Sequence, residues 1–156
     1  MLSKNARIVQ NLLEQKGYAY RVQELSENTH TAQDAANALH CLLEQIVKSI
    51  VFITASGQSI LVLVNGSNTV NIDKLETEIK ETVTKANAST TKELTGFPIG
   101  GVPPLGHKTP PSKVLIDPAL FKHAKIWAAA GTPRAVFELD SDQLERLSGG
   151  QGASIT

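Results

Sequence analysis

The segment Gln45–Val64, QIVKSIVFITASGQSILVLV, is the part of the chain that determines its fold. Two runs rich in β-branched residues, Gln45–Thr54 and Ser59–Val64, flank the short polar stretch Ala55–Gln58. β-branched residues favour strands, and a short glycine-containing stretch between two such runs favours a hairpin turn. We therefore predict a β-hairpin over residues 45–64. Both faces of its first strand are largely apolar, which places that strand in the middle of a sheet.

Lys48 interrupts the apolar pattern of the first strand. Because side chains alternate between the two faces of a strand, Lys48 shares a face with Ile46, Ile50 and Phe52. A lysine in this position either extends along its stem to reach solvent or projects into a cavity. A buried lysine is costly unless it is paired or functional, so Lys48 is our candidate for a cation that contacts a substrate.

Helices and strands are mixed on both sides of the hairpin, without a regular alternation of the two. This pattern predicts an α+β domain with flanking helices, built on a mixed or barrel-like sheet. We expect the domain to span residues 1–148 and residues 149–156 to form a flexible tail. The predicted elements are a helix between Ser3 and Gly17, a strand over Tyr18–Leu25, a helix that begins at Thr31, a helix over Asp73–Ala86, strands over Lys113–Ile116, Ile126–Ala130 and Ala135–Leu139, a helical turn over Pro118–His123, and a helix over Ser141–Leu147.

The segment Gly96–Pro111, GFPIGGVPPLGHKTPP, consists mostly of glycine and proline. Proline fixes φ and removes N–H groups, whereas glycine adopts backbone conformations that other residues avoid. Such a segment forms a stiff loop, and the amides of Gly100 and Gly101 can approach a ligand closely. Two interpretations fit the pattern: a cradle for a polarised carbonyl or a phosphate, and a long connector in polyproline conformation.

Composition sets limits on the class of protein. The chain has 156 residues with 41% apolar and 19% charged residues, as expected for one globular domain. Its formal net charge is zero, which argues against a protein that coats a nucleic acid by binding many phosphates. A protein that binds only the end of a nucleic acid is compatible with this charge. The sequence contains no signal-peptide pattern and no segment long enough to span a bilayer, so we expect a cytoplasmic protein.

Side chains that act in common hydrolytic mechanisms are few. A single cysteine excludes an internal disulfide, and no cysteine–histidine group has metal-ligand spacing. No nucleophile–base pair and no Gly-x-Ser-x-Gly elbow is present, which weakens the hypothesis of a generic esterase. His107 in the glycine–proline loop and Thr132 in a Gly-Thr-Pro turn are further candidates for substrate contact, although a surface histidine and a turn-forming threonine fit equally well.

Four stretches occur in an order that resembles one known family. They are Thr29–Ala36, Gln45–Phe52, Gly96–Gly106 and Ala129–Pro133. Together they resemble the YbaK/EbsC family of free-standing aminoacyl-tRNA deacylases, which are related to the editing insertion domain of bacterial prolyl-tRNA synthetase. The resemblance extends from about the first helix to Leu147. The lysine strand and the glycine–proline loop in combination make it specific.

The resemblance implies a fold, an activity and a set of site residues. The fold is the mixed α/β editing domain, which implies the curled form of the sheet, and the activity is hydrolysis of the ester between a wrong amino acid and the 3′ end of a tRNA. For this chain we expect tRNA-Pro that carries a small wrong amino acid such as cysteine or alanine. The strand lysine of the family matches Lys48, and the resemblance therefore implies that Lys48 is the catalytic residue. Its GxxxP loop motif matches the substrate-binding residues Gly100, Gly101, Val102 and Pro104.

The family uses neither a metal nor a cofactor, and it has no covalent enzyme nucleophile. The resemblance implies that backbone N–H groups of the loop stabilise the oxyanion and that the 2′-hydroxyl of the substrate assists proton transfer. Lys48 then holds the terminal ribose–phosphate or polarises the ester carbonyl. The implied partners are the acceptor end of aminoacyl-tRNA and, if the protein works in a complex, prolyl-tRNA synthetase.

A non-catalytic module is the alternative to an enzyme. Such a domain binds the tRNA acceptor end, or a small metabolite, in the same pocket without turnover. Incubation with mischarged tRNA-Pro species separates the two hypotheses and identifies the amino acid that is removed.

Overall fold

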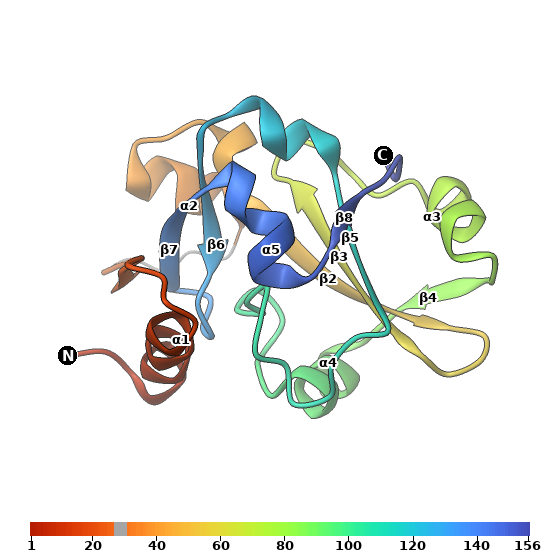
Figure 1. Ribbon diagram of the computed structural model, residues 1–156, viewed down its shortest axis with the longest axis horizontal. Helices are drawn as coiled ribbons and strands as arrows, with labels where there is room; N and C mark the ends of the chain where they lie inside the picture. Colours follow the sequence, from red (N-terminus) through yellow and green to blue (C-terminus); the bar gives the residue numbers. More distant parts are fainter. Residues whose placement is uncertain (27–30) are drawn as a thin grey trace.

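The predicted hairpin forms the centre of the larger sheet in the computed structural model, which describes residues 1–26 and 31–156 (Figure 1). Thr29 and His30 of the first family stretch lie outside the described residues. The larger sheet has the strand order β4-β2-β3-β5-β8, and a smaller sheet has the order β1-β7-β6. β2 and β3 are antiparallel, whereas β3 and β5 are parallel, so the larger sheet is mixed as expected.

The elements follow the predicted order with a few differences in extent. The strands are β1 (Val22–Glu24), β2 (Val47–Thr54), β3 (Ser59–Asn65), β4 (Val83–Lys85), β5 (Lys113–Ile116), β6 (Lys125–Ala129), β7 (Ala135–Asp140) and β8 (Gln151–Gly152). The α-helices are α1 (Lys4–Gln15), α2 (Ala32–Leu39), α3 (Ile72–Ile79), α4 (Ala88–Thr95) and α5 (Leu144–Ser148), and the 3₁₀ turns are η1 (Leu43–Gln45), η2 (Pro118–Lys122) and η3 (Ser141–Gln143).

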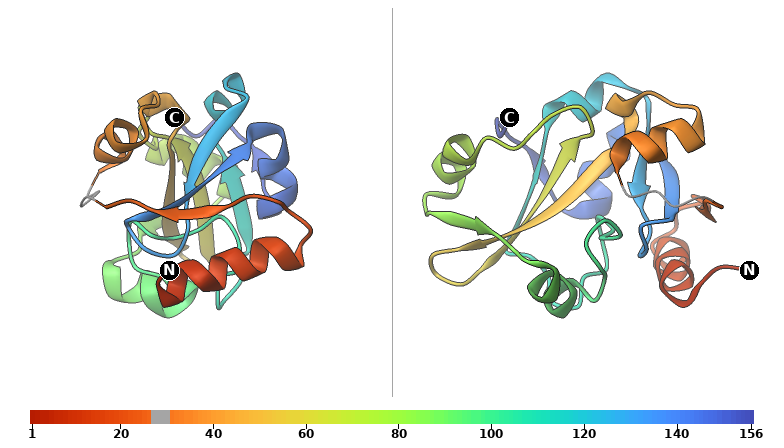
Figure 2. Two further views of the ribbon diagram at one scale, coloured as in Figure 1. Left: turned by 90° about the vertical axis from the view of Figure 1, so that its left-hand side faces the viewer. Right: turned by 180° about the vertical axis from the view of Figure 1, so that it is seen from behind.

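The main core lies between the two sheets. Val51 of β2 and Phe137 of β7 belong to one cluster of buried side chains, together with Leu13 of α1 and Leu144 of α5. A second cluster lies on the other face of the larger sheet, where Leu75 of α3 packs. α3 lies on the opposite side of the molecule from α1 in Figure 1, and Figure 2 shows the same arrangement from two further directions. The larger sheet is therefore covered on both faces.

The expected barrel-like sheet is not what the structure shows. The described strands form two sheets, and an isolated parallel bridge between Ile46 and Trp127 links them. β6 pairs with β7 over five residues, but within the described residues its backbone pairs with the Ile46–β2 segment only at this bridge, so the sheet does not close on itself. The opening between the sheets next to the bridge is where the cavity described below lies.

The helix predicted over Asp73–Ala86 is wrong in its second half. α3 ends where Lys80 adopts a left-handed conformation with φ of 65°, and Val83–Lys85 instead forms β4 beside β2. Val83 continues the helical spacing of Ile79, which explains the error. The next helix, α4, was not predicted; the side chain of Asn87 caps it by accepting a hydrogen bond from the N–H of Thr90 at 2.8 Å.

The C-terminal segment differs from the flexible tail expected over residues 149–156. β8 pairs with β5, and the N–H of Asn71 donates to the carbonyl of Ile155 at 2.7 Å. Ile155 is fully buried and Ala153 nearly so, in the cluster beneath α3. Long-range packing that the sequence pattern does not reveal thus makes this segment part of the domain.

The glycine–proline loop is fixed at both ends. Its first half contains a turn in which the N–H of Gly101 donates to the carbonyl of Pro98 at 2.9 Å, with Gly100 at φ of 86°. In its second half Leu105 is buried in the main core. The ring nitrogen Nε2 of His107 lies 2.7 Å from the carbonyl oxygen of Pro103. Burial lowers the pKa of His107, against the opposing effect of this hydrogen bond, so we assign the neutral tautomer in which Nε2–H donates.

We predict that Ile155→Ala lowers the free energy of unfolding by about 2–5 kcal/mol, because it leaves a cavity under α3. The exposed neighbour Ser154 provides the matched control, and Ser154→Ala should change stability by less than about 0.5 kcal/mol. Urea denaturation of both variants measures the difference. Equal stabilities of the two variants would contradict the packing of this segment.

We predict that His107 makes stability depend on pH. Its folded-state pKa lies below the unfolded value of about 6.5, so its contribution is fully present above that pH and is lost as the pH falls through the folded-state pKa. The variant His107→Gln keeps a donor for the Pro103 carbonyl but does not titrate. Wild type should therefore lose more unfolding free energy than His107→Gln between about pH 7.5 and pH 5. Parallel curves for the two proteins would contradict this role.

Candidate functional site

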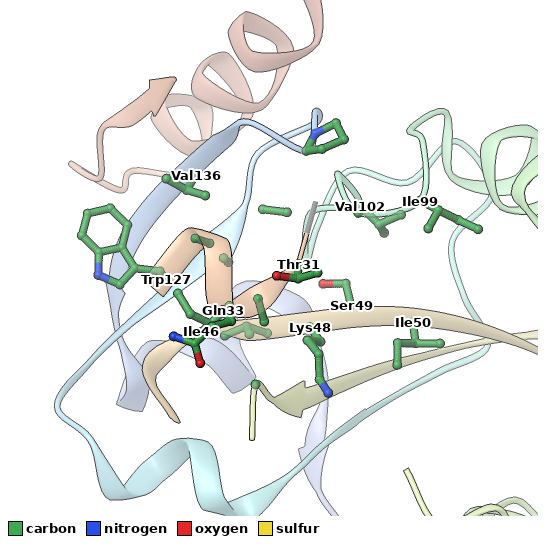
Figure 3. A pocket seen from close by; sticks show the side chains of 18 of the residues that line it. Thr31, Gln33, Ile46, Lys48, Ser49, Ile50, Ile99, Val102, Trp127 and Val136 are labelled. Atoms are coloured by element: carbon green, nitrogen blue, oxygen red, sulfur yellow. The ribbon is translucent and has the colours of Figure 1, made fainter. Parts of the chain in front are cut away.

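A cavity of about 560 Å³ lies beside the first half of β2. This volume falls within the range of about 300–1,000 Å³ that is usual for sites of small ligands. The beginning of α2, the turn Ile99–Val102 and the strands β6 and β7 form its other walls (Figure 3). The wall is mostly apolar, with Ile46, Val102 and Val136 among its residues, and its two cationic side chains among the described residues are Lys48 and Lys85.

The cavity exists because β4 covers only part of β2. β4 pairs with Phe52–Thr54 of β2, and the N–H of Ala86 donates to the carbonyl of Val51 at 2.9 Å. Before Val51, no strand of the described chain pairs with this edge until the isolated bridge at Ile46. Residues 47–50 are therefore exposed to the cavity along one edge. We call this stretch the open edge of β2.

Lys48 projects from the open edge as a half-buried side chain. Its Nζ donates to the carbonyl oxygen of Asn68 at 2.6 Å. Burial lowers the pKa of Lys48, the positive charge of Lys85 adds to this effect, and the negative charge of Asp117 opposes it. Of its three donors, one is engaged by Asn68. Lys48 thus enters the cavity wall with a fixed direction and with donors left for a ligand.

Asp117 fixes the turn that holds Lys48. It is 2% exposed, and its carboxylate accepts hydrogen bonds from the N–H of Asn65, from Nδ2 of Asn68 and from the N–H of Ala119, at 3.1, 2.8 and 3.0 Å. A buried carboxylate needs such donors, and here they come from the end of β3, the following turn and the start of η2. The position of the Asn68 carbonyl therefore depends on Asp117. We did not predict this role.

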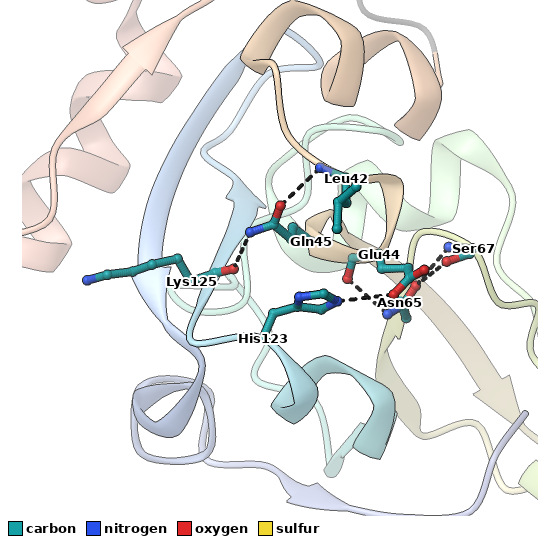
Figure 4. A network of polar contacts seen from close by, with 7 residues as sticks. All are labelled: Leu42, Glu44, Gln45, Asn65, Ser67, His123 and Lys125. Carbon is teal, nitrogen blue, oxygen red and sulfur yellow. Dashed lines mark hydrogen bonds and ion pairs between the residues drawn. The ribbon is translucent and has the colours of Figure 1, made fainter.

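A polar network fixes the connection between α2 and β2 at one end of the cavity (Figure 4). The side chain of Gln45 accepts from the N–H of Leu42 at 3.0 Å and donates to the carbonyl of Lys125 at 3.1 Å. Nδ2 of Asn65 donates to the carbonyl of Glu44 at 2.9 Å. These contacts attach η1 to β6 of one sheet and to β3 of the other. They set the spacing of the two sheets next to the Ile46–Trp127 bridge.

The structure divides the predicted loop residues into two groups. Gly100 and Val102 line the cavity together with Lys48. Gly101 does not, because its N–H is engaged by Pro98 and its carbonyl accepts from the N–H of Gly131 at 2.9 Å. A Cβ at position 101 would lie 2.7 Å from the backbone of Thr132, so the glycine is needed for close packing. The expected amide donor at Gly101 is therefore not free, whereas those of Gly100 and Val102 have no acceptor among the described residues.

The other predicted substrate contacts lie behind the cavity wall. Pro104 is buried, and His107 closes the second half of the loop against Pro103. Oγ1 of Thr132 accepts from the N–H groups of Arg134 and Ala135, at 3.2 and 3.0 Å, which is the turn-forming role considered above. None of Pro104, His107 and Thr132 is among the described residues that line the cavity.

Several cavity residues were not predicted. Ser49 follows Lys48 on β2 and projects from the opposite side of the strand in Figure 3. Lys85 lies on β4 opposite Phe52. Trp127 is half-buried and forms part of the wall. Ser49 is a polar residue in an otherwise apolar strand, and this was the one sequence feature that could have indicated its place in the cavity wall.

The described residues contain no group of three or more histidine, cysteine, aspartate or glutamate side chains placed to hold a metal ion. Among residues 1–26 and 31–156, no helix has the length and apolar character needed to cross a membrane.

Comparison with known proteins identifies the family. The family model of the aminoacyl-tRNA editing domain matches residues 26–147. A crystal structure of a proposed trans-editing enzyme for prolyl-tRNA synthetase superposes with a TM-score of 0.95 and 41% identity, over 100% of this chain and 99% of that one.

Two relatives are similar in sequence. A proline–tRNA ligase from Elusimicrobium minutum is 33% identical over 93 residues, which is 58% of this chain but 16% of the ligase. The uncharacterized protein YwhH of Bacillus subtilis is 27% identical over 127 residues, which is 81% of this chain and 80% of that protein. With most of its length matched by the family model and the same fold as a trans-editing protein, the chain belongs to the aminoacyl-tRNA editing domain family.

Proposed function

We propose that this protein is an aminoacyl-tRNA deacylase that hydrolyses the ester of mischarged tRNA. The observation that supports this most directly is the ammonium group of Lys48, held by the Asn68 carbonyl at 2.6 Å beside a mostly apolar cavity that Lys48 helps to line. A fixed cation beside a cavity suits a ligand with an anionic end and an apolar end. The terminal aminoacyl-adenosine of a charged tRNA is such a ligand. Membership in the editing domain family supports the same substrate class.

Lys48 and Lys85 form the cationic end of this proposed site, which receives the anionic end of the ligand. Lys85 lies opposite Phe52, so it projects from the same face of the sheet as Lys48. The turn Ile99–Val102 approaches from the other side of β2 in Figure 3. Of the two roles considered for Lys48, this placement favours a contact with the terminal ribose–phosphate over polarisation of the ester carbonyl.

The loop amides that have no acceptor among the described residues supply the second part of the mechanism. The N–H groups of Gly100 and Val102 donate to the oxyanion that forms when water adds to the ester carbonyl. The bond from the carbonyl carbon to the ribose oxygen then breaks, and this oxygen takes up a proton. The substrate's 2′-hydroxyl orients the water or relays that proton. The products are a free amino acid and an uncharged tRNA.

We infer that the substrate is tRNA-Pro with a small wrong amino acid, such as alanine or cysteine. The wall formed by β6 and β7 includes the small side chains of Ala128, Ala129 and Ala135. Relatives and structural neighbours include a proline–tRNA ligase and a proposed trans-editing enzyme for prolyl-tRNA synthetase. The implied partners are the tRNA acceptor end and prolyl-tRNA synthetase, and the implied location is the cytoplasm, where the tRNA is charged.

We predict that the protein releases alanine or cysteine from tRNA-Pro and leaves correctly charged Pro-tRNA-Pro intact. A panel of radiolabelled aminoacyl-tRNAs, followed by acid precipitation, measures the loss of each ester. Reactions without protein control for spontaneous hydrolysis. Binding of tRNA with no release of any amino acid would instead support the non-catalytic module.

We predict that Lys48→Ala lowers kcat/KM about 10- to 100-fold, because a charge-assisted hydrogen bond contributes about 1.5–3 kcal/mol. If Lys48 contacts a phosphate, the slope of log kcat/KM against log salt should also become shallower by about 0.7. Lys113→Ala removes an exposed strand lysine away from the cavity and is the matched control. A folded Lys48→Ala protein with the wild-type rate would refute the site, and a lower rate with an unchanged slope would indicate carbonyl polarisation.

A further inference from the structure

The hydroxyl of Ser49 is the buried side-chain polar atom that has no hydrogen-bond partner among the described residues. The residue lines the cavity, and its Oγ is shielded from bulk water. Most buried polar atoms in proteins are hydrogen-bonded, so an unpaired one calls for an explanation. A hydroxyl has one donor and two acceptor lone pairs, and at Ser49 none of them is engaged by a described residue.

The backbone at the open edge of β2 adds further acceptors. The carbonyl of Val51 points toward β4, because it accepts from the N–H of Ala86. Alternate residues of a strand direct their backbone groups to the same edge, so the N–H and C=O of Ser49 also point that way. No strand pairs with them in the described part of the chain. Ser49 therefore offers its hydroxyl and its carbonyl oxygen close together.

The charges around the cavity determine which ligand group fits there. No aspartate or glutamate is among the described residues that line it, and the lining cations are Lys48 and Lys85. Both lysines project from the face of β2 opposite to Ser49. A positively charged ligand group is therefore placed most favourably on the Ser49 side, where neutral oxygens accept its protons and the strand separates it from the two lysines.

We propose that Ser49 binds the α-ammonium group of the aminoacyl ester, through its Oγ and its backbone carbonyl. This inference rests on the proposed function and assigns the end of the substrate opposite to the phosphate. The ammonium donates to both oxygens, and it supplies the partner that the Ser49 hydroxyl lacks among the described residues. Ser49 thereby distinguishes the ester of an α-amino acid from an ester without the amino group.

The test compares two esters on the same tRNA-Pro: alanyl-tRNA and lactyl-tRNA, in which a hydroxyl group replaces the amino group. We expect wild type to have a higher kcat/KM for the alanyl ester than for the lactyl ester. In Ser49→Ala the ratio of the two kcat/KM values should be about tenfold smaller. Ser49→Thr keeps the hydroxyl and should retain the preference. Ser89→Ala removes an exposed serine on α4 and should behave as wild type.

Stability provides a second, independent measurement. Because Oγ of Ser49 has no partner among the described residues, Ser49→Ala should leave the melting temperature unchanged or raise it. A Ser49→Ala protein that hydrolyses the alanyl ester with the wild-type preference overturns this inference and leaves the proposed function intact. A melting temperature of Ser49→Ala below that of wild type would also overturn this inference, because such a loss indicates that the Ser49 hydroxyl has a partner in the protein. Failure of wild type to hydrolyse either ester overturns the proposed function, and this inference with it.

Discussion

The unequal pairing of β2 is the constraint on which the site depends. One side of this strand pairs with β3 along Val47–Ile53, whereas β4 covers only Phe52–Thr54 on the other side. The hydrophobic core thus holds β2 rigidly, while part of its other edge pairs with no strand of the described chain. Lys48 and Ser49 are neighbours on that edge and leave it on opposite faces. A single strand therefore presents a cation and a neutral acceptor to two ends of one cavity.

The sequence predicted the elements whose residues form local patterns. The hairpin around Ala55–Gln58 is confirmed because β-branched runs and a glycine turn suffice to specify it. β4 was mistaken for helix because Val83 fits the spacing of α3, and spacing cannot distinguish the two over three residues. The packed C-terminal segment was missed because Ile155 is buried by residues far away in the chain. Tertiary contacts decided each of these differences.

The same distinction applies to the site. Lys48, Gly100 and Val102 were predicted from the sequence as site residues, and all three line one cavity in the structure. Gly101 shows the limit, because close packing against Thr132 and close approach to a ligand both require glycine and look identical in sequence. Asp117 could not be identified, because its role arises from donors on three separate segments.

The pairing of β1 with β7 has a consequence for how the molecule folds. Val22 lies opposite Phe137, so this ladder joins segments separated by more than half of the chain. The loop-closure entropy for such contacts is large and delays their formation, whereas the β2–β3 hairpin closes over a few residues. We expect the hairpin to form early and the wall made by β6 and β7 to assemble late. Until then the open edge of β2 is exposed and can pair with a strand of another chain. Aggregation is therefore favoured for as long as this slow folding step lasts.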